Sequence, residues 1–132
     1  MFKREVTLVE MYRDEEYVLK RAKELPGLVI AEGQRRGLGD NNGQWLAEIP
    51  KEEGVLGVIY NLKKVTYISP EGMGFLMMGF ARARKRLLTF GLYGITKEVE
   101  KELKTSRLEK ILPIYSTLEE AVAKYETTHR KI

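Results

Sequence analysis

The chain has 132 residues, 43% hydrophobic and 32% charged, a balance typical of one folded domain rather than a disordered segment. It contains no cysteine, which excludes disulfides and thiolate metal sites and fits a reducing compartment. The net charge is only +4, and the single histidine, His129, lies near the chain end. We expect His129 to be frayed, which leaves little for a histidine-based metal or acid–base site, and we expect no cofactor.

No apolar run approaches the roughly 20 residues that a membrane helix needs. Residues 1–6 lead straight into alternating sequence without the apolar core of a signal peptide. We therefore expect a cytoplasmic protein with no membrane insertion.

The first third of the chain predicts two strands with an acidic segment between them. Residues 5–12 alternate as a strand does. Asp14-Glu15-Glu16 then carries the acidic residues of a helix start, and Pro26-Gly27 is a stop signal, so we expect a helical insertion at about 13–26. A hairpin through Arg13-Asp14 is the alternative. Residues 28–31 predict a short strand.

A polar, glycine-rich connection from Gly33 to Gly43 follows. It lacks the Gly-Lys-Ser/Thr ending of a phosphate cradle, so a flexible loop is the better interpretation. A short helix is expected around residues 44–49, with Trp45 as its anchor. Residues 55–60 are apolar on both faces, which is typical of a central parallel strand.

The segment Tyr67-Ile-Ser-Pro-Glu-Gly-Met73 predicts the start of a helix. Ser69 is suited to the N-cap because its oxygen can accept a hydrogen bond from an unpaired backbone N–H, and Pro70 suits the first helical position because it has no N–H to lose. One buried helix face is predicted after it by the spacing of apolar side chains: Met73, Leu76, Met77, Phe80 and Ala83. We expect Met78 to fill the core together with Met73 and Met77.

The cations that end this helix pattern are Arg82, Arg84, Lys85 and Arg86. Cations at a helix C-terminus complement its dipole, which explains them without a ligand. A nucleic-acid surface is the alternative, but no aromatic residues interleave with the arginines to stack bases. We expect no nucleic-acid partner.

The rest of the chain alternates strands at 87–93 and 111–115 with helices around 99–103 and 118–125. Alternating strands and helices imply right-handed crossovers. The expected fold is an α/β sandwich, in which a mixed, mostly parallel sheet packs against amphipathic helices.

Four segments in order resemble a STAS domain, the module shared by anti-sigma factor antagonists and the cytoplasmic tails of sulfate transporters. They are Tyr60-Asn-Leu-Lys-Lys-Val-Thr-Tyr-Ile68, Gly72-Met-Gly-Phe-Leu76, the strand and turn from Phe90 to Val99, and the strand and helix from Leu108 to Val122. The resemblance is weaker before residue 54. It implies a single STAS-like domain over residues 1–132.

The resemblance also implies where this chain departs from the family. In the family's Asp-Ser-Ser-Gly motif the first serine is phosphorylated by a partner kinase. The aligned residues here are Ser69, Pro70 and Glu71, and proline has no hydroxyl to accept phosphate. Ser69 is better explained as a plain cap than as a displaced acceptor. Glu71 is explained by the helix dipole, with partial imitation of phosphoserine as the alternative.

Two acidic positions of the family are also changed. Asn61 stands where an Asp is common, and Gly33-Gln34-Arg35-Arg36 replaces Gly-Glu-Leu-Asp. A rim that is acidic in the family is therefore neutral or basic here, and rim charges steer the choice of partner. We expect the partner to bind a surface made of Gln34, Arg35, Arg36, Asp40, Asn61, Ser69, Pro70, Glu71 and Met73.

These expectations describe a non-catalytic protein-interaction module of the anti-sigma factor antagonist type. Its partner would be an anti-sigma factor or a kinase-like regulatory protein, and it would run as a monomer or a homodimer. The alternative is a scaffold subunit of a larger regulatory or lipid-transport assembly. An enzyme is disfavoured because no nucleophile–base pair is apparent.

Overall fold

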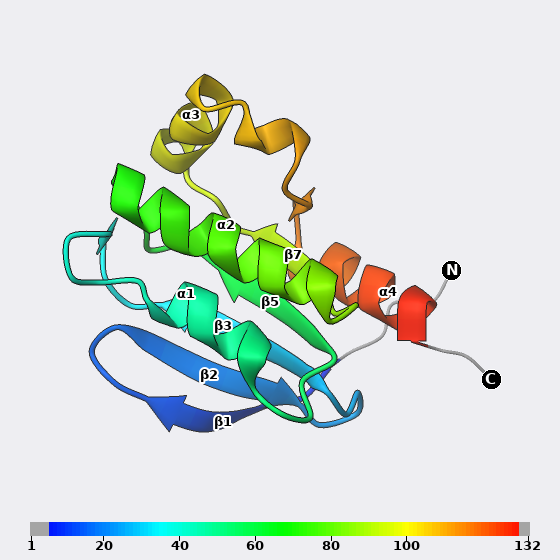
Figure 1. Ribbon diagram of the computed structural model, residues 1–132. Coiled ribbons are helices and arrows are strands. Elements are labelled where there is room, and N and C mark those ends of the chain that lie inside the picture. The colour runs from blue at the N-terminus through cyan, green and yellow to red at the C-terminus, as the bar shows by residue number, and fades with distance from the viewer. Residues whose placement is uncertain (1–5, 130–132) are drawn as a thin grey trace.

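The computed structural model describes residues 6–129, whose strands form one large and one small sheet (Figure 1). The large sheet has six strands in the order β1-β2-β3-β5-β7-β8. The first three strands pair antiparallel and the last four pair parallel. These strands are β1 (Leu8–Arg13), β2 (Tyr17–Ala22), β3 (Leu28–Gly33), β5 (Gly57–Asn61), β7 (Thr89–Tyr93) and β8 (Ile114–Tyr115). The prediction of a mixed, mostly parallel sheet is confirmed.

Within residues 6–129, three helices and two short 3₁₀ turns connect the strands, and a fourth helix follows the last strand. The helices are α1 (Trp45–Glu48), α2 (Pro70–Lys85), α3 (Lys97–Thr105) and α4 (Leu118–His129), and the turns are η1 (Ile49–Lys51) and η2 (Leu108–Lys110). Each parallel strand after β5 is reached through a helix, as right-handed crossovers require.

The helix expected within 13–26 is wrong: residues 17–22 form strand β2, and the hairpin alternative is the correct one. Asp14 explains the difference, because its carboxylate closes the turn instead of starting a helix. It accepts hydrogen bonds from the backbone N–H of Glu16 (2.7 Å) and of Tyr17 (2.9 Å) and from the Tyr12 hydroxyl (2.7 Å). Burial opposes the charged form, but these hydrogen bonds outweigh it and lower the pKa of Asp14.

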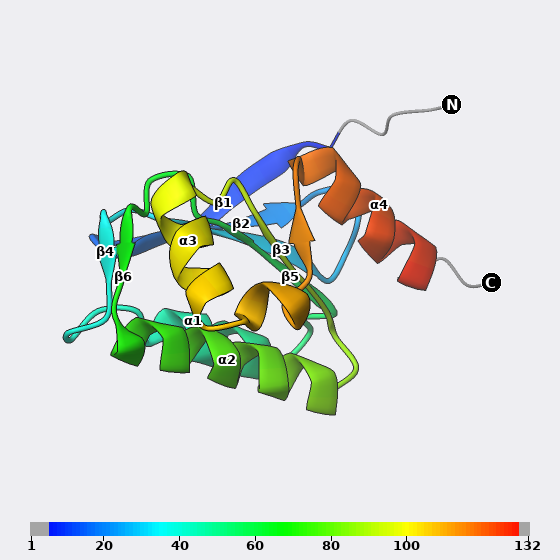
Figure 2. The ribbon, with the colours of Figure 1, turned by 90° about the horizontal axis from the view of Figure 1, so that it is seen from above.

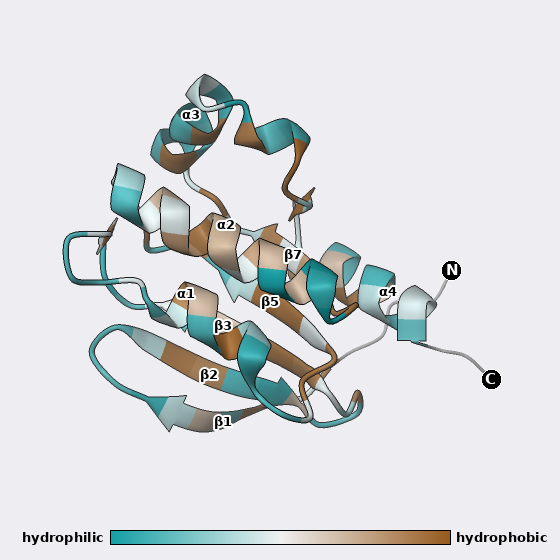
Figure 3. Ribbon diagram, in the orientation of Figure 1, coloured by the Kyte–Doolittle hydropathy of each residue, from teal (hydrophilic) through white to brown (hydrophobic). Residues whose placement is uncertain are grey.

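The two faces of the large sheet have separate cores (Figure 2). On one face α1, α2 and α3 cover apolar side chains of β3, β5 and β7, with Leu46, Leu76 and Leu103 fully buried. On the other face α4 packs Val122 and Tyr125 against Ile30, among others. Hydrophobic colour runs along β3 and β5, whereas α3 and the end of α2 show mostly hydrophilic colour (Figure 3).

The buried face of α2 follows the predicted spacing, with one exception. Leu76, Phe80 and Ala83 are buried, and Met73 and Met77 are half-buried against the same core. Met78 is 45% exposed, so its assignment to the core is wrong. Met78 comes one position after Met77, and a step of one residue turns a side chain about a quarter of the way round a helix.

Two further expectations concern single aromatic side chains. Trp45 is 4% exposed and stacks on Tyr17 with ring centroids 4.9 Å apart, which confirms it as the anchor of α1. His129 is not frayed: its ring lies 4.5 Å from that of Tyr125, and its Nε2 is 2.9 Å from the hydroxyl of Thr89. A contact with a strand 40 residues earlier holds this helix end in place.

A small second sheet brings the glycine-rich loop to the start of α2. Its strands are β4 (Gly37–Leu38) and β6 (Tyr67–Ile68), which pair in parallel. The loop after β4 and the helix after β6 therefore leave the sheet side by side. This pairing positions the surface described next.

Candidate functional site

The start of α2 is built by Ser69 as the sequence predicts. Its backbone is extended (φ −82°, ψ 169°), and its Oγ accepts a hydrogen bond from the N–H of Gly72 at 3.1 Å. Pro70 occupies the first helical position. Ser69 is only 3% exposed, so its hydroxyl is both occupied by the cap and withdrawn from solvent.

Gly39 covers the hydroxyl of Ser69 from the loop side. A Cβ placed on Gly39 would lie 1.7 Å from the Ser69 Oγ, and the positive φ of Gly39 (+111°) also favours glycine. The N–H of Ser69 donates to the carbonyl of Leu38 at 2.9 Å, which ties the two segments together. Gly39 therefore lies against the Ser69 hydroxyl, and a side chain at position 39 would not fit there without movement of the loop.

Glu71 fastens the same loop from the first turn of the helix. Its carboxylate accepts hydrogen bonds from the backbone N–H of Asp40 and, at 3.3 Å, of Asn41. Both loop residues have positive φ (55° and 78°). The Glu71 carboxylate is therefore engaged inside the molecule, although its side chain lies at the surface.

Two of the three residues at positions 34–36 hold parts of the rim together. Arg35 forms an ion pair with Glu15 at the tip of the β1–β2 hairpin (2.9 Å). The side-chain oxygen of Gln34 accepts a hydrogen bond from the Lys64 ammonium at 3.1 Å. Arg36 forms no ion pair within residues 6–129, so its charge is available at this edge.

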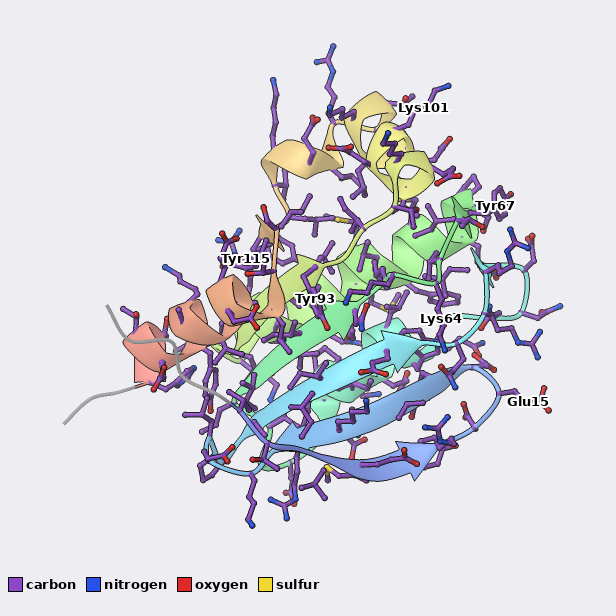
Figure 4. The ribbon with its side chains drawn as sticks, turned by 180° about the vertical axis from the view of Figure 1, so that it is seen from behind. Glu15, Lys64, Tyr67, Tyr93, Lys101 and Tyr115 are labelled. Carbon is purple, nitrogen blue, oxygen red and sulfur yellow. The ribbon has the colours of Figure 1, made fainter. Side chains whose placement is uncertain are left out.

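A shallow depression of about 260 Å³ lies between these arginines and the loop. Tyr67 forms one wall and is 56% exposed. Figure 4 shows Glu15, Lys64 and Tyr67 at the same end of the molecule. The depression is lined by Arg35, Arg36, Gly37, Leu38, Gly39, Asp40, Asn42 and Tyr67.

The structure gathers most of the predicted surface but not all of it. Gln34, Arg35, Arg36 and Asp40 share one end with the start of α2, where Ser69, Pro70 and Glu71 lie. Met73 is half-buried against the core, so only part of it can reach a partner. Asn61 ends β5, and its side-chain oxygen accepts a hydrogen bond from the N–H of Lys63 at 3.0 Å. Asn61 therefore closes a turn, and no hydrogen bond among the described residues links it to the other predicted positions.

Sequence reasoning missed three contributors to this surface: Glu15, Lys64 and Tyr67. Glu15 was assigned to a helix start, and only the hairpin places it beside Arg35. Tyr67 could have been recognised, because alternation along a strand puts it on the face opposite the buried Ile68.

The described part of the chain holds neither a cluster of metal-binding side chains nor a membrane-spanning helix. Residues 6–129 hold no group of three or more His, Asp or Glu side chains arranged to bind a metal ion. None of their helices is both long and apolar enough to cross a bilayer.

Several solved structures share this fold. A candidate anti-sigma factor antagonist from Thermotoga maritima superimposes with a TM-score of 0.72 at 20% identity, over 83% of this chain and 94% of that one. A sulfate transporter family protein from Wolinella succinogenes gives 0.67 at 19% identity, over 80% and 89%. An anti-sigma factor antagonist from Mycobacterium paratuberculosis gives 0.62 at 15%, over 92% and 95%.

Identities this low establish a shared fold alone. No curated protein matches the sequence significantly. The family model of the STAS domain, however, matches residues 17–121, which is most of the chain. The chain therefore belongs to the STAS domain family.

Proposed function

We propose that this protein is a non-catalytic protein-interaction module of the anti-sigma factor antagonist type that is not switched by phosphorylation at the start of α2. The observation that carries the proposal is the state of the two residues there. Pro70 is exposed but has no hydroxyl, whereas Ser69 is only 3% exposed and its hydroxyl is occupied by the helix cap. Regulation then comes from abundance, assembly or the partner itself.

The partner is an anti-sigma factor or a kinase-like regulatory protein in the cytoplasm. Its docking surface is the end of the molecule around Arg36, Asp40 and Tyr67, together with the start of α2, and Arg36 supplies its positive charge, which is unpaired within the described residues. Positive charge at a rim speeds association with a partner of opposite charge and disfavours partners matched to an acidic rim.

An affinity experiment in cells that express the protein tests the surface. Tagged wild-type protein should retain a regulatory protein of this class, and Arg36→Glu should reduce its recovery. Lys110→Glu is the matched control, since Lys110 is an exposed cation in η2, outside the depression. Equal recovery with all three proteins would contradict the assignment of the surface.

A scaffold subunit of a larger assembly is the second candidate, favoured by the open edge of the sheet. Met11 and Tyr12 in the edge strand β1 are 54% and 46% exposed. Unpaired edge strands are ready sites for pairing with another chain. Light scattering of the complex isolated from cells separates the two: an antagonist runs as a monomer, a dimer or a one-to-one complex, and a scaffold in a far larger particle.

A further inference from the structure

The four cations at the end of α2 do not have the same role. Arg82 donates a hydrogen bond to the carbonyl of Ala47 at 2.6 Å, and Arg86 donates one to the carbonyl of Glu52 at 3.2 Å. Both therefore fasten the segment of α1 and η1 to α2. The dipole of α2 is not needed to explain them, and neither is a ligand.

Arg84 differs from these two arginines. Its guanidinium lies over the ring of Phe80, 5.7 Å from the ring centre, and it forms no ion pair within residues 6–129. Lys124 on α4 likewise has no carboxylate partner within the described chain. Both cations line one cavity of about 590 Å³, where α2, β7 and α4 meet.

The short strand β8 leaves room for this cavity. β8 pairs only with Leu92 and Tyr93, so the first half of β7 has no neighbouring strand on that side. Apolar side chains form most of the resulting wall. The lining consists of Phe80, Leu87, Leu88, Phe90, Pro113 and Tyr115, with Thr89, Thr128 and the two cations as its polar members.

We propose that this cavity binds a single-chain carboxylate, such as a medium-chain fatty acid anion. The volume lies within the range of roughly 300–1,000 Å³ that is usual for small-ligand sites. Burial of a hydrocarbon chain against the apolar wall removes apolar surface from water, which favours binding. Arg84 and Lys124 supply charge for a carboxylate, which the planar guanidinium can bind through two parallel hydrogen bonds. A neutral or cationic ligand would leave both positive charges without a negative partner.

The cavity is separate from the proposed docking surface, with which it shares no lining residue. Tyr115 in its wall lies beside the start of α4, away from the end of the molecule that carries Glu15 and Tyr67 (Figure 4). The proposal therefore goes beyond the proposed function and does not depend on it.

Calorimetric titration with hexanoate, octanoate and decanoate, each below its micelle concentration, tests the proposal. Affinity should rise with chain length, by up to about fourfold per methylene. Decanoate should bind at least about tenfold tighter than decanol, because a charge-assisted hydrogen bond is roughly twice as strong as a neutral one.

Variants assign the charge requirement to the two cations. In the double variant Arg84→Gln/Lys124→Gln the preference for decanoate over decanol should disappear. The matched control is Lys85→Gln/Lys101→Gln, which removes two exposed charges outside the cavity and should bind decanoate like the wild type. Thermal unfolding of each variant checks that the fold is retained, and methyl NMR of wild-type protein should show decanoate shifting Leu87 and Leu88.

Several results would overturn the proposal. These are no binding of decanoate, equal binding of decanol, shifts confined to the start of α2, or equal losses in both double variants. Binding to phosphatidylglycerol vesicles that requires Arg84 and Lys124, without binding of free decanoate, would identify a membrane surface as the occupant and would also overturn it.

Discussion

The Glu71 carboxylate accepts a hydrogen bond from the backbone N–H of Asn41, 3.3 Å away and 30 positions earlier in the chain. The N–H of Asp40 donates to the same oxygen. The first turn of α2 is thus used to fix a loop that comes earlier in the chain. The loop in turn covers the Ser69 hydroxyl through Gly39.

Replacement of Glu71 should loosen the loop. Glu71→Ala removes two hydrogen bonds to a charged acceptor at the surface, so we expect a loss of about 1 kcal/mol in the free energy of unfolding. Amide hydrogen exchange at Asp40 and Asn41 should become faster. The control is Glu98→Ala, which removes a first-turn carboxylate from α3 without a loop contact and should cost less than about 0.5 kcal/mol. Unchanged exchange at both amides would show that Glu71 does not hold the loop.

The contact between Gly39 and Ser69 should tolerate no side chain. Gly39→Ala combines a positive φ of 111° with a Cβ 1.7 Å from Oγ, and we expect a loss of more than about 2 kcal/mol in urea unfolding. Gly54→Ala separates the two effects, since Gly54 also has a positive φ (+83°) but no atom within 4 Å of the new Cβ. Its loss should be about 1 kcal/mol. Equal losses for the two variants would contradict the close approach.

The hairpin turn should weaken in acid because of Asp14. Its pKa is lower in the folded chain than in the unfolded chain, so the stabilisation is complete above the unfolded value of about 3.9 and is lost as pH falls through the folded value. The stability difference between wild type and Asp14→Asn should shrink over this range. An NMR titration of the carboxyl carbon should give a midpoint below about 3.9, and Tyr12→Phe should move it upward. A midpoint at or above the ordinary value would contradict the role of the turn.

Local chemistry made the start of α2 predictable from sequence. A serine at the cap and a proline after it satisfy the helix end within four residues, so Ser69 and Pro70 needed no distant contact. The central strand β5 was equally clear, because a strand buried on both faces is a continuous apolar run.

Elements that depend on distant partners were not predictable in this way. The acidic run at Asp14 suits a helix start as well as a turn, and only pairing of β2 with β3 decides between them. The same holds for Glu71, whose loop partners come 30 and 31 positions earlier. His129 near the chain end was misjudged because its partner, Thr89, lies in strand β7, 40 positions earlier.

The most direct test of the central claim is intact-mass spectrometry after incubation with ATP and an anti-sigma factor kinase. An antagonist that carries the Asp-Ser-Ser-Gly motif serves as the positive control for the kinase, and Ser69→Ala is the matched variant. We predict that the positive control gains one phosphate while this protein keeps its mass. A gain of one phosphate by the wild-type chain that disappears in Ser69→Ala would contradict the account.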